Sequence, residues 1–232
     1  SGKAFLWAEL ACWGLRLARK PYVLTLHGGY LPQFAERWPT RVRRLLRSAA
    51  FVTSPSLFLH ERMKRMRKDI VVLPNALDVA RYRFRVRRNA RPLLVWLRAF
   101  HGNYNPSLAP GVVGRLESEF PEIHLTMIGK DKGDGTLQQA RDTAAKAGVA
   151  TRVSFRGPVA KDDVGEWLGQ SDIFLNTTNV DNAPVSLLEA MACGLCVVST
   201  SAGGVPYLVE DGREALLVPP GDGEAMASAV RR

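Results

Sequence analysis

The chain alternates short apolar runs with segments of helical periodicity. The apolar runs are three to five residues long and rich in Val, Ile and Leu, and helical patterns or turn residues separate most of them. Runs of this kind are typical of strands in a parallel sheet that helices cover on both faces. We therefore expect an α/β protein with doubly wound parallel sheets. Nine strands are predicted, at residues 22–26, 50–53, 70–73, 93–97, 124–128, 153–155, 173–176, 196–199 and 215–218.

Residues 74–92 break this alternation. They hold Asn, Asp and many charged residues where the rhythm would place a strand or an amphipathic helix. We therefore predict residues 76–92 as an interdomain linker between one domain at residues 1–75 and another at residues 93–232. Only about three strands precede this boundary, which is few for an independent doubly wound domain.

The composition is that of an ordinary globular chain. Its 232 residues are 46% hydrophobic and 23% charged, which argues against disorder and provides for a large core. Residues 4–18 are rich in Phe, Leu, Trp and Ala, but Glu9 and Arg16 interrupt them. We predict a helix packed on a sheet there and not a membrane span. The first residues lack the plan of a secretory signal, so we expect a cytoplasmic location.

The three cysteines are too few for a disulfide framework. Cys193 and Cys196 have the spacing of a redox or zinc pair, but no second pair of ligands lies at a suitable spacing for zinc. Both fall at the predicted C-terminal end of a helix, where the helix dipole disfavours a thiolate. Metal and redox roles are therefore not expected.

Charge is divided unevenly along the chain. Residues 1–91 contain 20 Lys and Arg against 5 Asp and Glu, whereas residues 92–232 contain 12 against 17. The basic clusters carry Leu or Met between the charges, which suits an anionic membrane surface and a peripheral position on the inner face of the cytoplasmic membrane. A solvated surface without a partner is the main alternative. Nucleic acid is not expected, because the sequence has no recognition motif for it.

Residues 181–198 place two carboxylates eight positions apart around the predicted start of a helix. Pro184 suits the first position of that helix, since its missing N–H would be unpaired there anyway, and Gly194 would end it. Amides of the first turn can then meet a phosphate. Glu189, about 7 to 8 Å further along the helix, can accept hydrogen bonds from a vicinal diol such as a ribose. The alternative is an ordinary βα unit with Asp181 and Glu189 on its surface.

This segment resembles the donor-site motif of retaining GT-B glycosyltransferases, in which seven residues separate two glutamates. Family four, the glycosyl transferases group 1, is the most similar. The resemblance implies two Rossmann-like domains, of which the first is incomplete and the second is truncated before its terminal crossover helices, so that the chain is a fragment. Other segments resemble this family's linker, first donor strand, a later strand, glycine turn and closing strand. In that order they are residues 71–78, 94–98, 197–200, 203–206 and 212–220.

The resemblance also implies the residues of the donor site. Arg98 matches an arginine that holds the diphosphate, in place of the metal that other glycosyltransferases use. The family's lysine five positions later is Asn103 here, which we expect among the donor-binding residues, and His101 or Lys130 is the candidate substitute for the lysine. Asp181 matches the first glutamate and would contact sugar hydroxyls, with one methylene less reach. Glu189 matches the glutamate that binds the ribose, and further donor contacts are expected from Gly157, Val159, Asn182, Ala183 and Val185.

On the acceptor side, His27 follows a predicted strand and precedes Gly28 and Gly29, which let a ligand approach the backbone. In the resembling enzymes a histidine here faces the reacting sugar. We therefore expect His27 to act in catalysis, either by donating a hydrogen bond to the transferred sugar or by moving a proton. A structural role is the alternative.

The implied reaction transfers a sugar from a nucleoside diphosphate sugar to an acceptor hydroxyl with retention of configuration, in the synthesis of a polysaccharide, glycolipid or cell-envelope glycan. Arg98 and helix amides would stabilise the charge that develops on the leaving diphosphate. No metal or other cofactor is expected, and the partners would be the donor and a glycan or lipid-linked acceptor. A nucleotide-sugar epimerase, a phosphorylase of the same fold and a non-catalytic sugar-nucleotide binding fragment are the alternatives.

Overall fold

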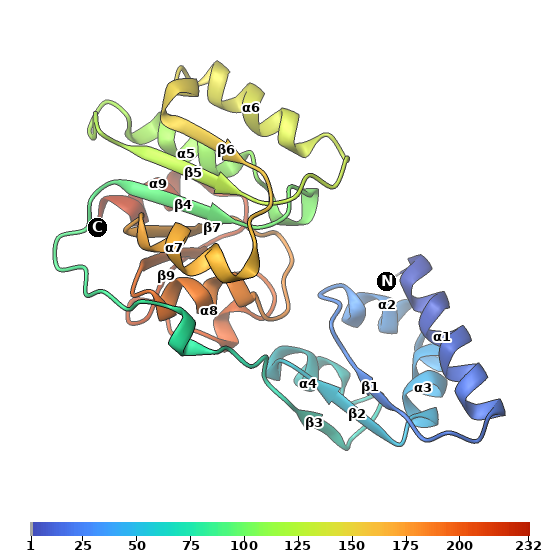
Figure 1. The fold of residues 1–232 in the computed structure, drawn as a ribbon. Coiled ribbons are helices and arrows are strands. Elements are labelled where there is room, and N and C mark those ends of the chain that lie inside the picture. The colour runs from blue at the N-terminus through green and yellow to red at the C-terminus, as the bar shows by residue number, and fades with distance from the viewer. Residues whose placement is uncertain (1) are drawn as a thin grey trace. The chain divides into compact units, whose positions relative to one another are not determined.

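The computed structural model describes residues 2–232, with side chains from Ala4 onward, so Ser1 of the expected first domain lies outside the described residues. The chain forms two compact units, each built on a parallel sheet (Figure 1). The N-terminal unit comprises residues 1–76 and 180–183, and the C-terminal unit comprises residues 77–179 and 184–232.

The N-terminal unit contains a three-stranded parallel sheet in the order β1-β2-β3. In helix α3, Val42, Leu45 and Leu46 are buried at positions i, i+3 and i+4, while arginines occupy the rest of its surface. These residues join Leu59 and Met63 in the core of this unit. The elements are α1 Gly2–Leu17, β1 Val23–Thr25, α2 Leu31–Arg37, α3 Pro39–Ser48, β2 Phe51–Ser54, α4 Leu57–Met63 and β3 Ile70–Val72.

Helix α1 forms where the sequence predicts a helix, but it buries few of its apolar side chains. Phe5 and Cys12 lie two turns apart on one face and join the core of the N-terminal unit. Trp7 and Trp13 are 73% and 61% exposed. The helix therefore presents an apolar face beside its buried one.

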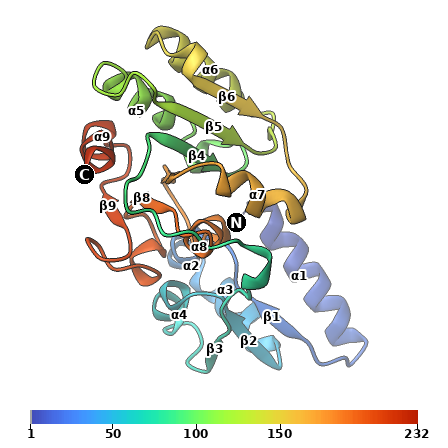
Figure 2. The ribbon, with the colours of Figure 1, turned by 60° about the vertical axis from the view of Figure 1, so that its left-hand side comes forward.

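The C-terminal unit contains a six-stranded parallel sheet in the order β6-β5-β4-β7-β8-β9 (Figure 1 and Figure 2). Helices α5, α6 and α9 cover one face, and α7 and α8 cover the other. The strands are β4 Leu93–Leu97, β5 His124–Ile128, β6 Val153–Arg156, β7 Ile173–Asn176, β8 Cys196–Thr200 and β9 Leu216–Val218. The helices are α5 Leu108–Leu116, α6 Thr136–Lys146, α7 Val164–Gly169, α8 Val185–Ala192 and α9 Gly223–Arg231. Short 3₁₀ turns are η1 Val79–Arg81, η2 Gly102–Tyr104, η3 Ala150–Arg152, η4 Lys161–Asp163 and η5 Val205–Tyr207.

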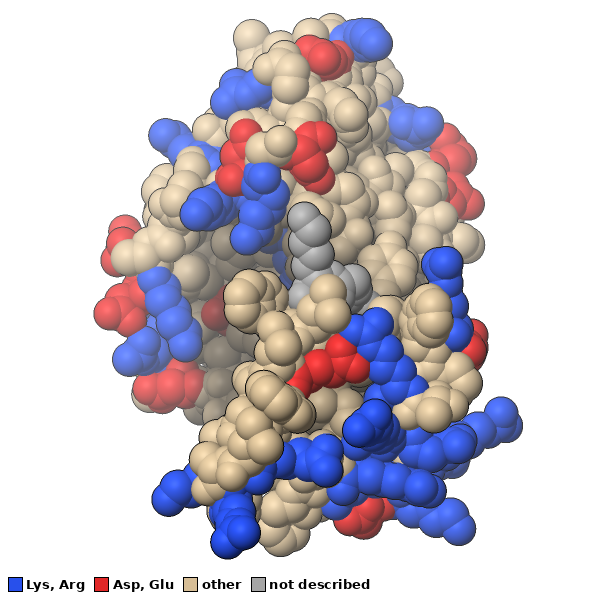
Figure 3. All heavy atoms as spheres, turned by 90° about the vertical axis from the view of Figure 1, so that its right-hand side faces the viewer, with Lys and Arg blue, Asp and Glu red and all other residues tan. Residues whose placement is uncertain are grey.

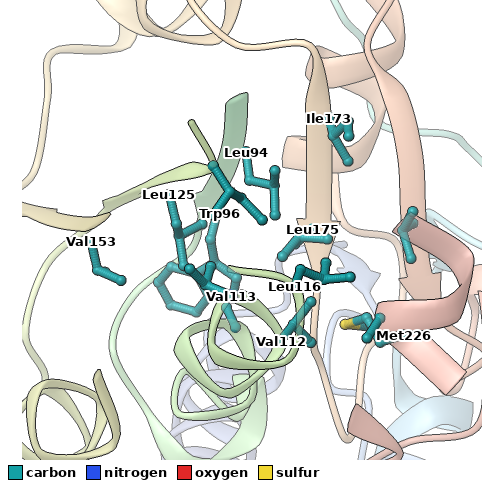
Figure 4. Close-up of a cluster of buried hydrophobic side chains, with 14 of the residues drawn as sticks. Leu94, Trp96, Val112, Val113, Leu116, Leu125, Val153, Ile173, Leu175 and Met226 are labelled. Carbon is teal, nitrogen blue, oxygen red and sulfur yellow. The ribbon is translucent and has the colours of Figure 1, made fainter. Parts of the chain in front are cut away.

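The pleat of β4 divides its side chains between two cores. Leu94 and Trp96 point into the cluster that α5 and α9 complete, as Figure 4 shows, and Val95 points into the cluster under α7 and α8. All three side chains are at most 1% exposed. Each such burial contributes roughly 1.5–3 kcal/mol relative to an exposed side chain. This double coverage explains why the strand reads as a continuous apolar run.

The predicted fold class is confirmed. All nine predicted strands are present, and every strand end agrees with the prediction to within one residue. The strands pair in parallel throughout the two sheets. Because both faces of the larger sheet are covered, the local apolar run was enough to locate each of its strands.

Residues 77–92, most of the expected linker, pack on the C-terminal unit; we call this segment the strap. The strap is fastened to Asp172, whose side chain is 3% exposed and lies just before β7. The guanidinium of Arg87, 2% exposed, donates to Asp172 at 3.1 Å, that of Arg91 donates at 2.8 Å, and Arg85 also donates to it. Burial opposes ionisation of Asp172, but Arg91 and then Arg85 outweigh it and hold its pKa at about 2.

Candidate functional site

The strand order of the C-terminal sheet reverses between β4 and β7. Strands β5 and β6 extend the sheet on one side of β4, and β7, β8 and β9 extend it on the other. Ligands of open α/β sheets bind beyond the carboxyl ends of the strands at such a point. The residue after β4 is Arg98, and the residue after β7 is Thr177. Arg98, the residue predicted to bind the diphosphate, therefore lies at the edge of the sheet where this fold binds ligands.

Arg98 is positioned by its backbone and by an aromatic ring. Its N–H donates to the carbonyl of Ile128 at 3.1 Å, which continues the β4–β5 pairing. Its guanidinium carbon lies 4.0 Å from the centroid of the Tyr104 ring, in a cation–π contact. A Cβ at Gly129 would overlap the carbonyl oxygen of Arg98, so only glycine fits there. A guanidinium can stack on a ring and still bind a diphosphate through its edge.

The 3₁₀ turn η2, which follows Arg98, is fastened to the end of β7. The Thr177 hydroxyl accepts a hydrogen bond from the buried Trp96 indole at 2.8 Å and donates to the carbonyl of Tyr104 at 2.7 Å. The carbonyl of Asn103 accepts from the amide of Asn179 at 2.7 Å. Asn103, at the position expected for a lysine, therefore holds this turn through its backbone.

The two candidate substitutes for that lysine have different surroundings. His101 accepts a hydrogen bond at Nδ1 from the amide two residues on, at 3.1 Å, and its Nε2 lies 3.9 Å from Asp134. Asp134 also accepts from the amide of Gly102 at 2.9 Å. The hydrogen bond from the Thr136 hydroxyl has the largest effect on Asp134 and the bond from the Gly102 amide the next largest, and they lower the pKa of Asp134 to about 2. His101 is thus part of a small network at the loop, whereas Lys130 is exposed.

Helix α8 begins one residue later than predicted. Pro184 is its N-cap, with ψ of 108°, and Val185 is the first helical residue, so the prediction that Pro184 occupies the first helical position is wrong. The extended ψ is usual for an N-cap and places the carbonyl of Pro184 to accept from the amide of Leu187 at 3.2 Å. Within the described part of the chain, the buried hydroxyl of Ser186 in the first turn has no hydrogen-bond partner.

The other end of α8 agrees with the prediction. Gly194 has a φ of 73° directly after the C-cap, Cys193. Its amide donates to Met191 at 2.8 Å, and the amide of Leu195 donates to Ala190 at 3.0 Å. This pair of bonds is a Schellman motif, which needs a left-handed residue and therefore favours glycine.

Glu189 is buried at the fifth position of α8 and is 7% exposed. Its Oε1 accepts a hydrogen bond from the Tyr82 hydroxyl at 2.9 Å, and no other described residue hydrogen bonds to the carboxylate. Burial and then this bond raise the pKa of Tyr82 to about 12, so its hydroxyl remains a donor at neutral pH. The carboxylate is thus fixed in place by a residue of the strap.

The first carboxylate of the motif belongs to the other unit. Asp181, Asn182 and Ala183 pack with the N-terminal unit, whereas Glu189 belongs to the C-terminal unit. The amide of Asn182 donates to Asp181 Oδ1 at 2.9 Å, and the hydroxyl of Ser56 donates to Asn182 Oδ1. Residues 180–183, which include the first three residues of the motif, therefore pack with the N-terminal unit.

The predicted acceptor-side residues follow β1. The side chain of His27 is exposed, and the carbonyl of Gly28 accepts from the amide of Leu31 at 2.9 Å as α2 begins. A Cβ at Gly29 would lie 2.9 Å from Val180 Cγ1. A glycine is therefore needed at position 29 for packing inside the N-terminal unit.

Two of the predicted donor contacts, Gly157 and Val159, follow β6. Gly157 is exposed, and a Cβ there would meet no atom within 4 Å. Val159 is half-buried and packs against the cluster under α7 and α8. Close packing therefore does not explain the glycine at this position.

Sequence reasoning missed three residues of this site, Tyr82, Tyr104 and Ser186. Tyr82 and Tyr104 lie in irregular segments, and their partners are far away in the sequence, so no local pattern points to them. Ser186 did carry a signal, since a hydroxyl in the first turn of a helix lies where anions bind.

Solved structures share this architecture over nearly the whole chain. The Anabaena protein HepE in complex with UDP-glucose is 19% identical, with a TM-score of 0.83, and the match covers 97% of this chain and 65% of that one. Sucrose-phosphate synthase from Thermosynechococcus elongatus is 19% identical, with a TM-score of 0.80, and the match covers 96% and 62%. Together with the two parallel-sheet units, these likenesses define a protein of the GT-B fold.

The chain belongs to the glycosyl transferases group 1 family, whose model matches residues 91–232. The model of Glycosyltransferase Family 4 matches residues 2–81. Among curated proteins, D-inositol 3-phosphate glycosyltransferase from Mycobacteroides abscessus is 31% identical over 134 residues, which is 57% of this chain and 30% of that protein. The protein of the same name from Streptomyces avermitilis is 30% identical over 142 residues, which is 57% of this chain and 31% of that protein. The matched region thus spans about a third of these relatives' length.

Two further properties concern residues 2–232. No helix there combines the length and the apolar character needed to cross a bilayer. No three His, Cys, Asp or Glu side chains in that range are grouped so that they could hold a metal ion. Cys193 is buried, which raises the pKa of its thiol, and Cys196 is exposed.

Proposed function

We propose that this chain carries the donor site of a retaining glycosyltransferase, which transfers a sugar from a nucleoside diphosphate sugar to an acceptor hydroxyl. One observation carries the proposal: Glu189 is a buried carboxylate on α8, and the hydroxyl of Ser186 in the first turn of that helix has no partner among the described residues. A buried carboxylate that has one oxygen able to accept a further hydrogen bond can bind the hydroxyls of a ribose diol. A helix start with a spare donor suits a phosphate.

The proposed roles follow from the chemistry of each group. Arg98 and the first-turn donors of α8 bind the diphosphate and stabilise the negative charge that it gains as the sugar leaves. Glu189 binds the ribose. Asp181 binds sugar hydroxyls, and His27 donates a hydrogen bond to the transferred sugar or moves a proton. Backbone groups of Gly157, Val159, Asn182, Ala183 and Val185 complete the donor contacts, without a metal ion.

UDP is the first nucleotide to test, because the structurally similar HepE was solved in complex with UDP-glucose. The chain is titrated calorimetrically with UDP, GDP and ADP in excess chelator. We expect one nucleotide to bind saturably, and Glu189→Gln to weaken it by about tenfold or more, since a hydrogen bond to a charged group contributes about 1.5–3 kcal/mol. Glu210→Gln, which changes an exposed carboxylate, is the matched control.

Arg98→Lys separates charge from geometry. Lysine keeps the positive charge but loses the planar fork that binds a diphosphate bidentately, so we expect weaker binding of the diphosphate and little change for the nucleoside. A folded chain that binds none of the three nucleotides would contradict the proposal. Release of free UDP from UDP-glucose in the presence of acceptors then tests transfer, and binding without turnover would indicate a non-catalytic module.

We also propose that the N-terminal unit meets an anionic lipid surface, on the inner face of the cytoplasmic membrane, where a glycan or lipid-linked acceptor would be found. Lys and Arg side chains gather over this unit in the lower part of Figure 3. A groove of about 630 Å³ between α1 and α3 combines the apolar side chains of Leu10, Trp13 and Trp38 with Arg16 and Arg44. Tryptophan beside arginine is typical of surfaces that sit at the lipid headgroup level.

Vesicle sedimentation tests this surface. We expect the chain to sediment with vesicles of phosphatidylglycerol and phosphatidylcholine but not with phosphatidylcholine alone. Replacing Arg43, Arg44 and Arg47 by Gln should weaken binding markedly, because each Lys or Arg near the lipid contributes about 1 kcal/mol. The same number of replacements at Arg115, Arg141 and Arg213 in the C-terminal unit is the control. Equal losses in the two variants would indicate a mere net-charge effect.

A further inference from the structure

The strap contacts α8 at two places along its length. Tyr82 hydrogen bonds to Glu189 in the middle of the helix, at 2.9 Å. At its end, the carbonyl of Cys193 accepts from the amide of Arg85 at 3.2 Å and from the guanidinium of Arg87 at 2.6 Å. The segment that joins the two units in sequence therefore fixes the helix that carries the proposed ribose ligand.

Tyr82 has little freedom to move. Its side chain is 7% exposed and belongs to the cluster under α7 and α8. A Cβ at Gly165 would lie 3.4 Å from Tyr82 Cδ1 and 2.8 Å from the carbonyl oxygen of Arg81, so the strap approaches α7 as closely as a glycine permits. Asp78 caps the 3₁₀ turn just before Tyr82 by accepting from the amide of Ala80 at 3.3 Å. The cap at Asp78 and the close packing against α7 thus fix the backbone around Tyr82, and with it the position of the tyrosine hydroxyl.

The hydrogen bond from Tyr82 gives the two oxygens of the Glu189 carboxylate different roles. A buried carboxylate without a donor is costly, and a hydrogen bond from a neutral hydroxyl offsets that cost without neutralising the charge. With Oε1 occupied by Tyr82, Oε2 is the oxygen that has no donor within the described residues. The bond also restricts rotation of the carboxylate about its last torsion, which is otherwise broad.

We propose that Tyr82 is a positioning residue of the donor site: its hydroxyl holds Oε1 of Glu189 so that Oε2 accepts from the 2′- or 3′-hydroxyl of the nucleotide ribose. The inference rests on the proposed function of the site, because it takes Glu189 to be the ribose ligand. It goes beyond the carboxylate motif by assigning a role to the strap, whose Tyr82 lies 107 residues before Glu189 in the sequence.

The test compares UDP with 2′-deoxy-UDP and 3′-deoxy-UDP by calorimetry. Wild type should prefer UDP over at least one deoxy analogue by about tenfold or more, as expected for a hydrogen bond to a carboxylate. Tyr82→Phe should lose most of that preference while retaining binding of the deoxy analogue. Tyr207→Phe, at a tyrosine that is 45% exposed, is the matched control and should keep the wild-type preference.

A double-variant cycle shows whether Tyr82 acts through Glu189. If it does, Tyr82→Phe should reduce the preference in the wild-type background and change it little in Glu189→Gln. A Tyr82→Phe protein that weakens UDP and the deoxy analogues equally would overturn the positioning role, since a general loss of packing predicts that result. An unchanged preference would overturn it as well. Failure of the wild type to bind any nucleoside diphosphate would instead overturn the proposed function on which the inference rests.

Discussion

Replacing Asp172 by Asn should destabilise the C-terminal unit strongly. The substitution keeps the size of the side chain, so it creates no cavity and removes only the charge. The guanidinium of Arg87 is 2% exposed and would then be a buried cation without its carboxylate. Breaking one partner of such a buried pair costs about 3–5 kcal/mol. Arg85 and Arg91 also pair with Asp172, but they are about half-exposed, so water can solvate their charges once the carboxylate is replaced.

The lowered pKa of Asp172 gives an independent estimate and a pH dependence. A folded-state pKa of about 2 against an ordinary value of 3.8 corresponds to roughly 2 kcal/mol of stability. Because the folded pKa is lowered, this contribution is present above about pH 4 and is lost as the pH falls toward 2. We therefore expect Asp172→Asn to cost about 3 kcal/mol at pH 7 and progressively less between pH 4 and pH 2.

The assay is urea unfolding, with hydrogen exchange of β4 and β7 peptides to assign the transition to the C-terminal unit. Asp162→Asn is the matched control, because Asp162 pairs with Arg81 at a site where the carboxylate is 80% exposed, and it should change stability by less than about 0.5 kcal/mol. Equal effects of the two substitutions at pH 7 would refute the reasoning. So would a difference that persists undiminished at pH 2.

Three further substitutions test the geometry of the site. Gly194→Ala should cost more than about 1 kcal/mol in urea unfolding, because its φ is 73° and a Cβ would lie 2.5 Å from a strap carbonyl; Gly212→Ala, with φ of 76° and open space, isolates the backbone part. Gly129→Ala should displace the carbonyl of Arg98 and weaken UDP binding about tenfold more than it weakens uridine binding, which calorimetry measures. Thr177→Val leaves the buried indole and the carbonyl of η2 without a partner, and should lower the unfolding free energy by about 1–3 kcal/mol. If Thr177→Ser, which keeps the hydroxyl, costs as much, the hydrogen bonds are not the cause.

The sequence alone determined the order and position of the strands. Residues 93–97, 124–128 and 173–176 were predicted to the residue, because these strands are covered on both faces and most of their positions are apolar. It also located the end of α8 at Gly194, since a left-handed position leaves a local mark in the choice of residue. Signals of this kind depend only on neighbours in the chain. Glu189 became a candidate through the spacing of its motif and the resemblance to the family, and Arg98 through that resemblance alone.

The tertiary structure decided which groups hold those candidates. The strap is charged and was therefore expected to be a linker, yet Arg87 is buried because Asp172, 85 residues away, supplies its counter-charge. Tyr82 reaches Glu189 across 107 residues, and neither segment carries a periodic pattern that anticipates the pairing. A local pattern records whether a position is covered, and only the folded chain specifies what covers it. Burial of polar groups depends on partners from distant segments, so their roles emerge only once the sheet has brought those segments together.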